Sequence, residues 1–167
     1  LWQGDEKYWP RRSPLLFPIV CGLWKDEYRV DGRTFNLPRH GFARDMDFEV
    51  VEKSDTSVTY TLESSPETRE VYPYDFELDV TYILNDDAIS VIWSVKNTGK
   101  QEMHFQIGGH PAFNLPGVAE GDKMHGSILF DNVEPLTRII GNTGGCIKPE
   151  RYELKTDRQV WNFDEES

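Results

Sequence analysis

The chain has 167 residues, a length that suits one domain with a substantial core. Hydrophobic residues make up 38% of it, and 29 acidic residues outnumber 18 basic ones, giving a net charge of −11. This composition excludes a disordered chain, and the acidic balance argues against nucleic-acid binding, which requires a basic surface. No apolar run approaches the roughly 20 residues of a membrane-spanning helix. We therefore expect residues 1–167 to form a single domain that binds neither nucleic acid nor membrane.

The two cysteines, Cys21 and Cys146, are far apart in the sequence and form no CxxC motif. Such a pair is more typical of free thiols in a reducing compartment than of a disulfide framework. The cysteine pattern therefore favours a cytoplasmic location.

Apolar and polar residues alternate through much of the first hundred positions, and this period of two predicts three consecutive β-hairpins. The first is marked by Asp31-Gly32, a two-residue turn signal between two alternating segments. The six strands are expected at residues 27–30 and 33–37, 47–54 and 56–63, and 75–84 and 88–97. Hairpins in succession imply antiparallel sheet.

A further strand is predicted over residues 102–108, and shorter ones over 127–131 and 158–163. Trp93 lies on the apolar face of the strand at 88–97, which predicts a core position for its ring. No window of 12 or more residues has a helical period. The fold class expected is therefore all-β, an antiparallel β-sandwich or barrel.

Two of the four histidines lie where a strand pattern breaks at glycine. His40 is in "RHGFARD" (39–45) and His110 is in "GGHPAFNLP" (108–116). Loops at such positions often direct side chains into a cleft. From spacing alone, each histidine fits either a proton-transfer role or a structural one. In the structural role, His110 would be a loop imidazole that caps a backbone carbonyl, and His40 would lie in an exposed basic turn. His104 and His125 are expected to be structural.

Other kinds of site find no matching pattern. The histidines have no HxH or HxxxH spacing and no carboxylate placed with them, so no metal site is expected. The sequence has no GxSxG elbow, no Cys/His signature and no glycine-rich loop between a strand and a helix. We expect neither a serine or cysteine nucleophile nor any cofactor.

Four motifs, taken together and in order, resemble the aldose 1-epimerase (mutarotase) family, and most closely its bacterial branch. They are "LWQGDEKYW" (1–9), "SPLLFPIVCG" (13–22), "RHGFARD" and "GGHPAFNLP". The resemblance extends over essentially the whole chain. It implies a galactose mutarotase-like β-supersandwich, of which this chain would be an incomplete portion lacking the first strands and the C-terminal third.

The resemblance implies an isomerase that interconverts the α and β anomers of a free hexose without metal or cofactor. An acid protonates the ring oxygen while a base takes the proton of the anomeric hydroxyl. His110 matches the general-acid histidine of the family, and His40 matches a second histidine that hydrogen-bonds the sugar near its ring oxygen. Arg44, Asn114 and Arg12 are the candidates for binding the substrate, a monosaccharide.

The sequence is compatible with two alternatives. A basic pocket would favour a hexose 6-phosphate as substrate, and the arginines available for it are Arg11, Arg12, Arg39 and Arg44. The second alternative is a non-catalytic carbohydrate-binding module. The catalytic base of family members is a glutamate in the C-terminal third of their sequences, and no motif in this chain matches it. Glu165 and Glu166 lie in an acidic run that does not resemble that motif. The sugar and the oligomeric state are left undetermined.

Overall fold

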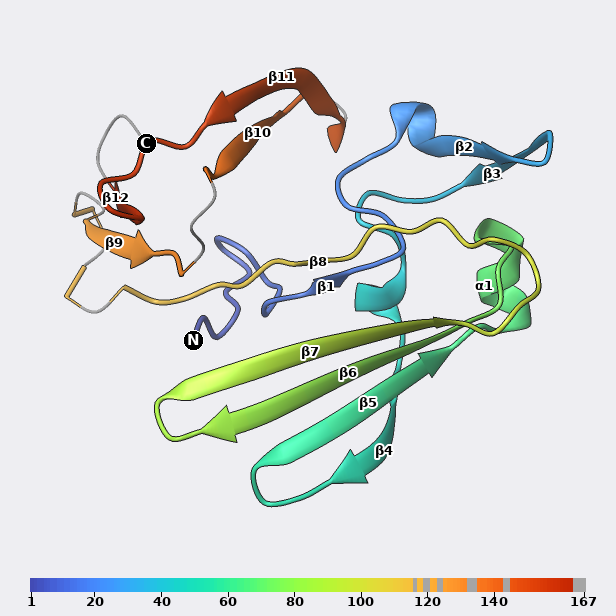
Figure 1. Ribbon diagram of the computed structural model, residues 1–167, viewed down its shortest axis with the longest axis horizontal. Helices are drawn as coiled ribbons and strands as arrows, with labels where there is room; N and C mark the ends of the chain where they lie inside the picture. Colours follow the sequence, from blue (N-terminus) through green and yellow to red (C-terminus); the bar gives the residue numbers. More distant parts are fainter. Residues whose placement is uncertain (116, 119–120, 123–124, 132–134, 143–144, 164–167) are drawn as a thin grey trace. The chain divides into compact units, whose positions relative to one another are not determined.

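The structure is a computed structural model that describes residues 1–115, 117–118, 121–122, 125–131, 135–142 and 145–163. It divides into two compact units, one formed by Pro14–His110 and the other by Leu1–Ser13 with Pro111–Ser167 (Figure 1). Each unit is described by itself. All ladders between strands in the described residues are antiparallel, as predicted. The expectation that residues 1–167 form a single domain stays a prediction.

A four-stranded sheet in the order β4-β5-β6-β7 is the largest element of the Pro14–His110 unit. Its strands are β4 (Glu49–Lys53), β5 (Ser57–Glu63), β6 (Phe76–Asn85) and β7 (Ala88–Asn97). They confirm the second and third predicted hairpins. The sheet runs from the turn that joins β6 and β7 to the short helix α1 (Pro66–Val71) at its other end (Figure 1).

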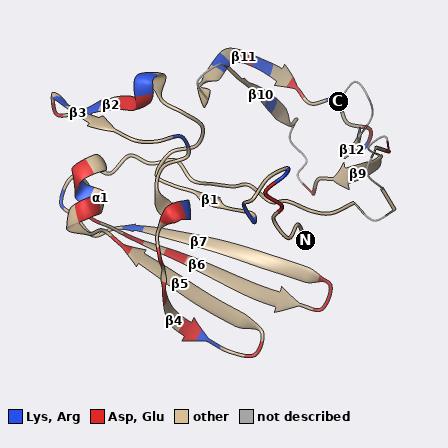
Figure 2. Ribbon diagram, turned by 180° about the vertical axis from the view of Figure 1, so that it is seen from behind, with Lys and Arg blue, Asp and Glu red and all other residues tan. Residues whose placement is uncertain are grey.

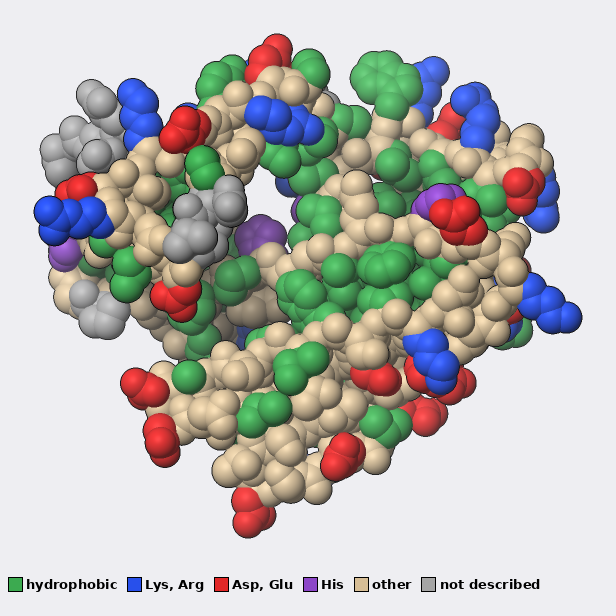
Figure 3. All heavy atoms as spheres, viewed as in Figure 1, with side chains coloured by type: hydrophobic (Ala, Val, Ile, Leu, Met, Phe, Trp, Pro, Cys, Tyr) green, Lys and Arg blue, Asp and Glu red, His purple; other side chains and the backbone are tan. Residues whose placement is uncertain are grey.

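One face of this sheet is apolar along its whole length, but only the end near α1 is buried. On β6, Phe76, Leu78 and Val80 are at most 4% exposed, whereas Leu84 on the same face is 57% exposed. The rings that cover the buried end come from Phe17, Phe42 and Tyr72. The outer halves of β6 and β7 carry no charged residue outside their turn (Figure 2), and hydrophobic side chains reach the surface over the sheet (Figure 3).

The prediction of a core position for Trp93 is therefore wrong. Trp93 pairs with Val80 across the β6–β7 ladder, yet it is 38% exposed. In the sheet, β7 is an edge strand, and the aromatic cluster that buries the face packs against β6 nearer α1. Alternation in the sequence thus identified the apolar face correctly, but not how far along the strand that face is covered.

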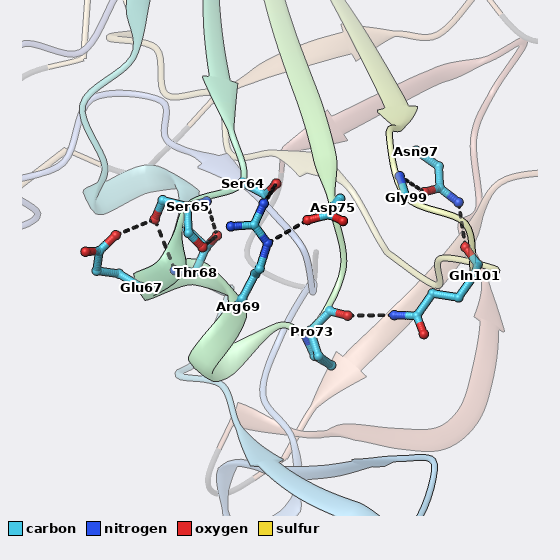
Figure 4. Close-up of polar contacts among 10 residues, drawn as sticks. All are labelled: Ser64, Ser65, Glu67, Thr68, Arg69, Pro73, Asp75, Asn97, Gly99 and Gln101. Atoms are coloured by element: carbon cyan, nitrogen blue, oxygen red, sulfur yellow. Dashed lines mark hydrogen bonds and ion pairs between the residues drawn. The ribbon is translucent and has the colours of Figure 1, made fainter.

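Polar contacts hold α1 where the chain passes from β5 to β6 (Figure 4). Ser65 caps the helix in a capping box with Thr68, each side chain accepting from the other residue's backbone N–H. Arg69 pairs with Asp75 at the start of β6, with 2.6 Å between Nε and Oδ1. The side-chain amide of Gln101 donates to the carbonyl oxygen of Pro73 at 2.6 Å. This six-residue helix is shorter than any window in which a helical period can be recognised.

The first predicted hairpin is also confirmed. It consists of β2 (Glu27–Val30) and β3 (Arg33–Asn36), joined at Asp31-Gly32 and preceded by the 3-10 turn η1 (Trp24–Asp26). A second 3-10 turn, η2 (Ala43–Asp45), follows β3.

The strand predicted over residues 102–108 is wrong except at its end. Only β8 (Gly108–Gly109) forms a ladder, paired with β1 (Leu15–Leu16). The segment that follows β1 would have to continue the pairing, but it contains Pro18, which has no N–H to donate. There the Gln106 N–H donates to the Pro18 carbonyl at 2.8 Å, and the Gln106 side chain accepts from the Val20 N–H at 3.0 Å. The side chain of Gln106 thus takes the place of the backbone carbonyl that the next pair of the ladder would supply.

In its described residues, the other unit has two antiparallel strand pairs, one between β9 and β12 and one between the consecutive strands β10 and β11. β9 (Gly126–Leu129) pairs with β12 (Val160–Phe163), which confirms the short strands predicted near those positions. β10 (Thr137–Gly141) pairs with β11 (Ile147–Glu153), and sequence alternation did not predict this pair. Both cysteines of the chain are free thiols. No helix in the described part of the chain combines the length and hydropathy that a bilayer-spanning segment requires.

Candidate active site

His40 lies in a tight turn between β3 and η2, where two successive residues adopt the left-handed conformation. Its φ is +70° and that of Gly41 is +71°. Gly41 suits this geometry because it has no Cβ, and a Cβ built there would lie 2.2 Å from the carbonyl oxygen of Phe17. The same oxygen accepts the N–H groups of Phe42 and Ala43 at 3.1 and 3.2 Å. Close packing on Phe17 therefore fixes the turn that carries His40.

The imidazole of His40 is fixed by Cys21. The backbone N–H of His40 donates to the Cys21 carbonyl at 2.8 Å, and the backbone N–H of Cys21 donates to Nδ1 of the His40 ring at 3.0 Å. Backbone groups are strong hydrogen-bonding partners, and two bonds to one residue hold both the main chain and the ring. The ring orientation is therefore set before any ligand binds.

His110 follows β8 directly, and its position depends on the same segment of chain. Its backbone N–H donates to the Pro14 carbonyl at 3.1 Å, next to the β1–β8 ladder that pairs Leu15 with Gly109. Residues 14–21 therefore bind His110 at one end and His40 at the other. This segment is the central part of the motif "SPLLFPIVCG".

The two histidines lie close together in the Pro14–His110 unit. Their ring centroids are 6.5 Å apart and the ring planes are nearly perpendicular, at 80°. Two imidazoles at this distance can both reach polar atoms of one small molecule placed between them. The arrangement suits proton transfer and hydrogen bonding to a single small molecule.

The side chain of Arg44 contacts neighbouring residues of its own turn. Its Nη2 donates to the carbonyl of Arg39 at 2.9 Å, and its Nε lies 3.4 Å from a carboxylate oxygen of Asp45. That last contact is close enough for an ion pair but lacks hydrogen-bond geometry, so the buried Nε has no hydrogen-bond partner among the described residues. The side chain is 18% exposed. Arg44 thus belongs to the same turn as His40, held by its neighbours.

Arg12 and Asn114 belong to the other unit. The Nε of Arg12 donates to the carbonyl of Gln3, and Nδ2 of Asn114 donates to the carbonyl of Leu1 at 2.9 Å. Both side chains therefore fasten the first residues of the chain. Their predicted contacts with substrate stay a prediction.

A separate open hollow of about 370 Å³ lies in the Pro14–His110 unit, and neither His40 nor His110 lines it. Tyr28 and Tyr72 form part of its wall, and their hydroxyls donate to the carbonyls of Val71 and His104. Burial raises the pKa of both tyrosines, and the neighbouring Tyr74 adds to the effect. At neutral pH they are protonated hydrogen-bond donors with a structural role.

No three His, Cys, Asp or Glu side chains gather closely enough to hold a metal ion within the described ranges. Sequence reasoning identified both histidines of the pair. It missed Cys21 as the partner of the His40 ring, and no sequence signal marks that contact because its donor is a backbone N–H. Residues Glu165 and Glu166 lie outside the described residues.

The antiparallel β fold agrees with what comparison with known proteins finds. A profile of the aldose 1-epimerase family matches residues 1–129. The chain is 39% identical to the protein LacX of Lactococcus lactis subsp. lactis over 142 residues, a match covering 80% of this chain and 47% of LacX. The chain belongs to the aldose 1-epimerase family.

Two solved structures share the fold over nearly the whole chain. One is a galactose mutarotase related enzyme from Lactobacillus acidophilus, with 35% identity and a TM-score of 0.82, covering 98% of this chain and 54% of that one. The other is a galactose mutarotase-like protein from Lactobacillus casei ATCC 334, with 33% identity and a TM-score of 0.85, covering 97% and 56%. The predicted galactose mutarotase-like fold is confirmed. The chain spans about half the length of the relatives it matches.

Proposed function

We propose that the protein is an aldose 1-epimerase that interconverts the α and β anomers of a free hexose. The observation that carries this proposal is the pairing of His40 and His110, whose rings lie 6.5 Å apart although they come from distant parts of the sequence. Membership of the aldose 1-epimerase family supports the reaction class. The cysteine pattern is the support for a cytoplasmic location.

In the proposed reaction, His110 donates a proton to the ring oxygen of the sugar while a carboxylate base takes the proton of the anomeric hydroxyl. The bond between C1 and the ring oxygen breaks, and C1 becomes the carbonyl carbon of an aldehyde. After rotation about the C1–C2 bond, the protonated base gives its proton to the carbonyl oxygen, His110 takes back the proton of the hydroxyl that attacks C1, and the ring closes as the other anomer. His40 hydrogen-bonds the sugar beside the ring oxygen, and Arg44, Arg12 and Asn114 are the proposed contacts to the remaining hydroxyls.

The resemblance implies that the base is a glutamate in the C-terminal third of the sequences of family members. The chain spans about half the length of its relatives, and the proposal places the base in the part of them that it does not match. The test therefore requires the full-length protein.

The test is the rate at which freshly dissolved α-D-glucose and α-D-galactose reach anomeric equilibrium, followed by polarimetry or NMR exchange. We expect the full-length protein to accelerate the exchange and His110→Ala to return it to the buffer rate, because the acid is removed. His125→Ala is the matched control, since His125 is exposed and has no proposed contact with the substrate. Unchanged catalysis in His110→Ala would overturn the assignment of the acid.

The alternatives are separated by adding a hexose 6-phosphate to this assay and by measuring the binding of a hexose. Binding of a hexose without acceleration of its exchange would indicate a carbohydrate-binding module. Exchange confined to a hexose 6-phosphate would indicate a phosphosugar epimerase. No specific observation favours that substrate, because Arg44 is already paired with Asp45 and donates to the Arg39 carbonyl.

A further inference from the structure

The hydrogen bond from the Cys21 peptide to the His40 ring has a chemical consequence. A neutral imidazole has one N–H donor and one acceptor nitrogen, and the partner of one nitrogen determines where the proton resides. Nδ1 of His40 accepts the N–H of Cys21 at 3.0 Å. Nδ1 therefore carries no proton, and the proton of the neutral ring is on Nε2.

We propose that the peptide N–H of Cys21 is a positioning group that locks His40 in the Nε2–H tautomer, so that His40 serves the sugar only as a hydrogen-bond donor. The role toward the sugar rests on the proposed function, whereas the tautomer rests on the contact itself. A doubly protonated His40 would direct an Nδ1–H at the Cys21 N–H and lose this bond. A second proton on His40 would therefore break this contact, and the proposal leaves proton donation to His110.

The backbone around this contact is unusual. Cys21 has a φ of +67° and His40 a φ of +70°, both in the left-handed region that residues other than glycine rarely adopt. Such a residue is strained and persists only where the surroundings hold it. Here the reciprocal bonds between Cys21 and His40 hold both residues. Strained residues of this kind cluster at functional sites, which fits a contact that orients a ring.

The direct test is the protonation state of the His40 ring nitrogens in the full-length protein with 15N-labelled histidine. Long-range 1H–15N correlation at neutral pH distinguishes protonated from unprotonated ring nitrogens, and His40→Gln identifies which signals belong to His40. We expect an unprotonated Nδ1 and a protonated Nε2. A protonated Nδ1, or shifts averaged between the two tautomers, would overturn the proposal.

The variant Cys21→Ala distinguishes the effect of the Cys21 peptide N–H on the His40 tautomer from that of the Cys21 thiol. This variant keeps the N–H that donates to the ring, so the nitrogen shifts of His40 should remain as in the wild type. Movement of the proton to Nδ1 in Cys21→Ala would show that the thiol sets the tautomer, contrary to the proposal. None of these measurements requires the protein to turn over a sugar.

The role toward the sugar is tested by comparing two replacements of His40. The amide nitrogen of Gln can take the place of Nε2 and donate to the substrate, whereas the shorter Asn reaches only to the position of Nδ1. We expect kcat/KM for anomer exchange to be at least about tenfold higher in His40→Gln than in His40→Asn, the effect of about one hydrogen bond.

A purely structural role of His40 predicts the opposite order, because Asn tolerates a φ of +70° better than Gln does. Activity of His40→Asn equal to or above that of His40→Gln would therefore contradict the donor role. Thermal unfolding of both variants shows whether each is folded at the assay temperature. If the wild type itself fails to accelerate exchange, the proposed function fails, and the NMR result decides the tautomer separately.

Discussion

At the residue scale, the carbonyl group of Phe17 fixes the backbone turn that carries His40. The Phe17 oxygen accepts two backbone N–H groups from the turn after His40 and leaves no room for a side chain at Gly41. Phe17 itself is fully buried and contacts the rings of Phe42, Tyr72 and Phe76. The position of the candidate catalytic turn therefore depends directly on the hydrophobic core.

Gly41→Ala should strongly destabilise the protein. Its Cβ would meet the Phe17 oxygen at 2.2 Å in a left-handed backbone, so we expect a loss of at least about 3 kcal/mol in the free energy of unfolding. Gly32→Ala is the matched control, because Gly32 has a φ of +77° and no heavy atom within 4 Å of the added Cβ. Backbone strain alone should cost it about 1 kcal/mol. Urea denaturation measures both, and equal losses would refute the role of the Phe17 contact.

Sequence patterns could identify His40 and His110 as candidates because each stands beside glycine at the end of an alternating segment. They could not identify the Cys21 contact. That bond joins the backbone N–H of Cys21 to the ring of His40, 19 residues along the chain, and both residues have left-handed backbones. Propensity alone would not assign that conformation to cysteine or histidine. The geometry of the site thus depends on long-range packing that local patterns do not encode.

At the element scale, the β4–β7 sheet shows how burial changes along one face. Leu78 and Leu84 lie on the same strand and the same face, yet Leu78 is fully buried and Leu84 is 57% exposed. We expect Leu78→Ala to lower the free energy of unfolding by about 2–5 kcal/mol, because it leaves a cavity beneath the aromatic cluster. Leu84→Ala should cost less than about 1 kcal/mol. Chemical denaturation compares the pair, and similar losses would show that the outer end of this face is also covered.

The hairpins were predictable because each depends on alternation and a turn within a few tens of residues. The segment at 102–107 was not, because its strand character depends on a partner that lies 86 residues earlier along the chain. The missing N–H of Pro18 interrupts the ladder there, and the side chain of Gln106 accepts the N–H of Val20 in place of a backbone carbonyl. Alternation within a segment does not report whether its partner can continue the pairing.

At the scale of the whole molecule, two tyrosines, one partly and one fully buried, join separate elements of the Pro14–His110 unit. The hydroxyl of Tyr28 on β2 donates to the carbonyl of Val71 at the end of α1, and that of Tyr72 donates to the carbonyl of His104. The hairpin β2–β3, the helix and the segment after β7 are therefore linked by phenol groups that must stay protonated. Their ionisation would break these links together.

The protein should therefore lose stability in alkali through these tyrosines. Burial raises the pKa of Tyr28 and Tyr72 above the ordinary value of about 10, with a smaller contribution from neighbouring tyrosines. Above that pH the unfolded chain releases protons that the folded chain retains, so the free energy of unfolding falls as pH rises, by at most about 1.4 kcal/mol per pH unit for each tyrosine. Below it, their contribution is fully present.

Urea denaturation between pH 8 and 11 tests this dependence. Tyr72→Phe should lower stability by about 1 kcal/mol at pH 8, because it removes the bond to His104, and should also make the alkaline decline shallower. Tyr8→Phe is the control, since Tyr8 is 58% exposed, and its decline should follow that of the wild type. A Tyr72→Phe protein that declines as steeply as the wild type would show that groups other than this tyrosine cause the loss. A shallower decline would place the alkaline weakness of the fold at the junction of β2, α1 and the segment that leads to His110.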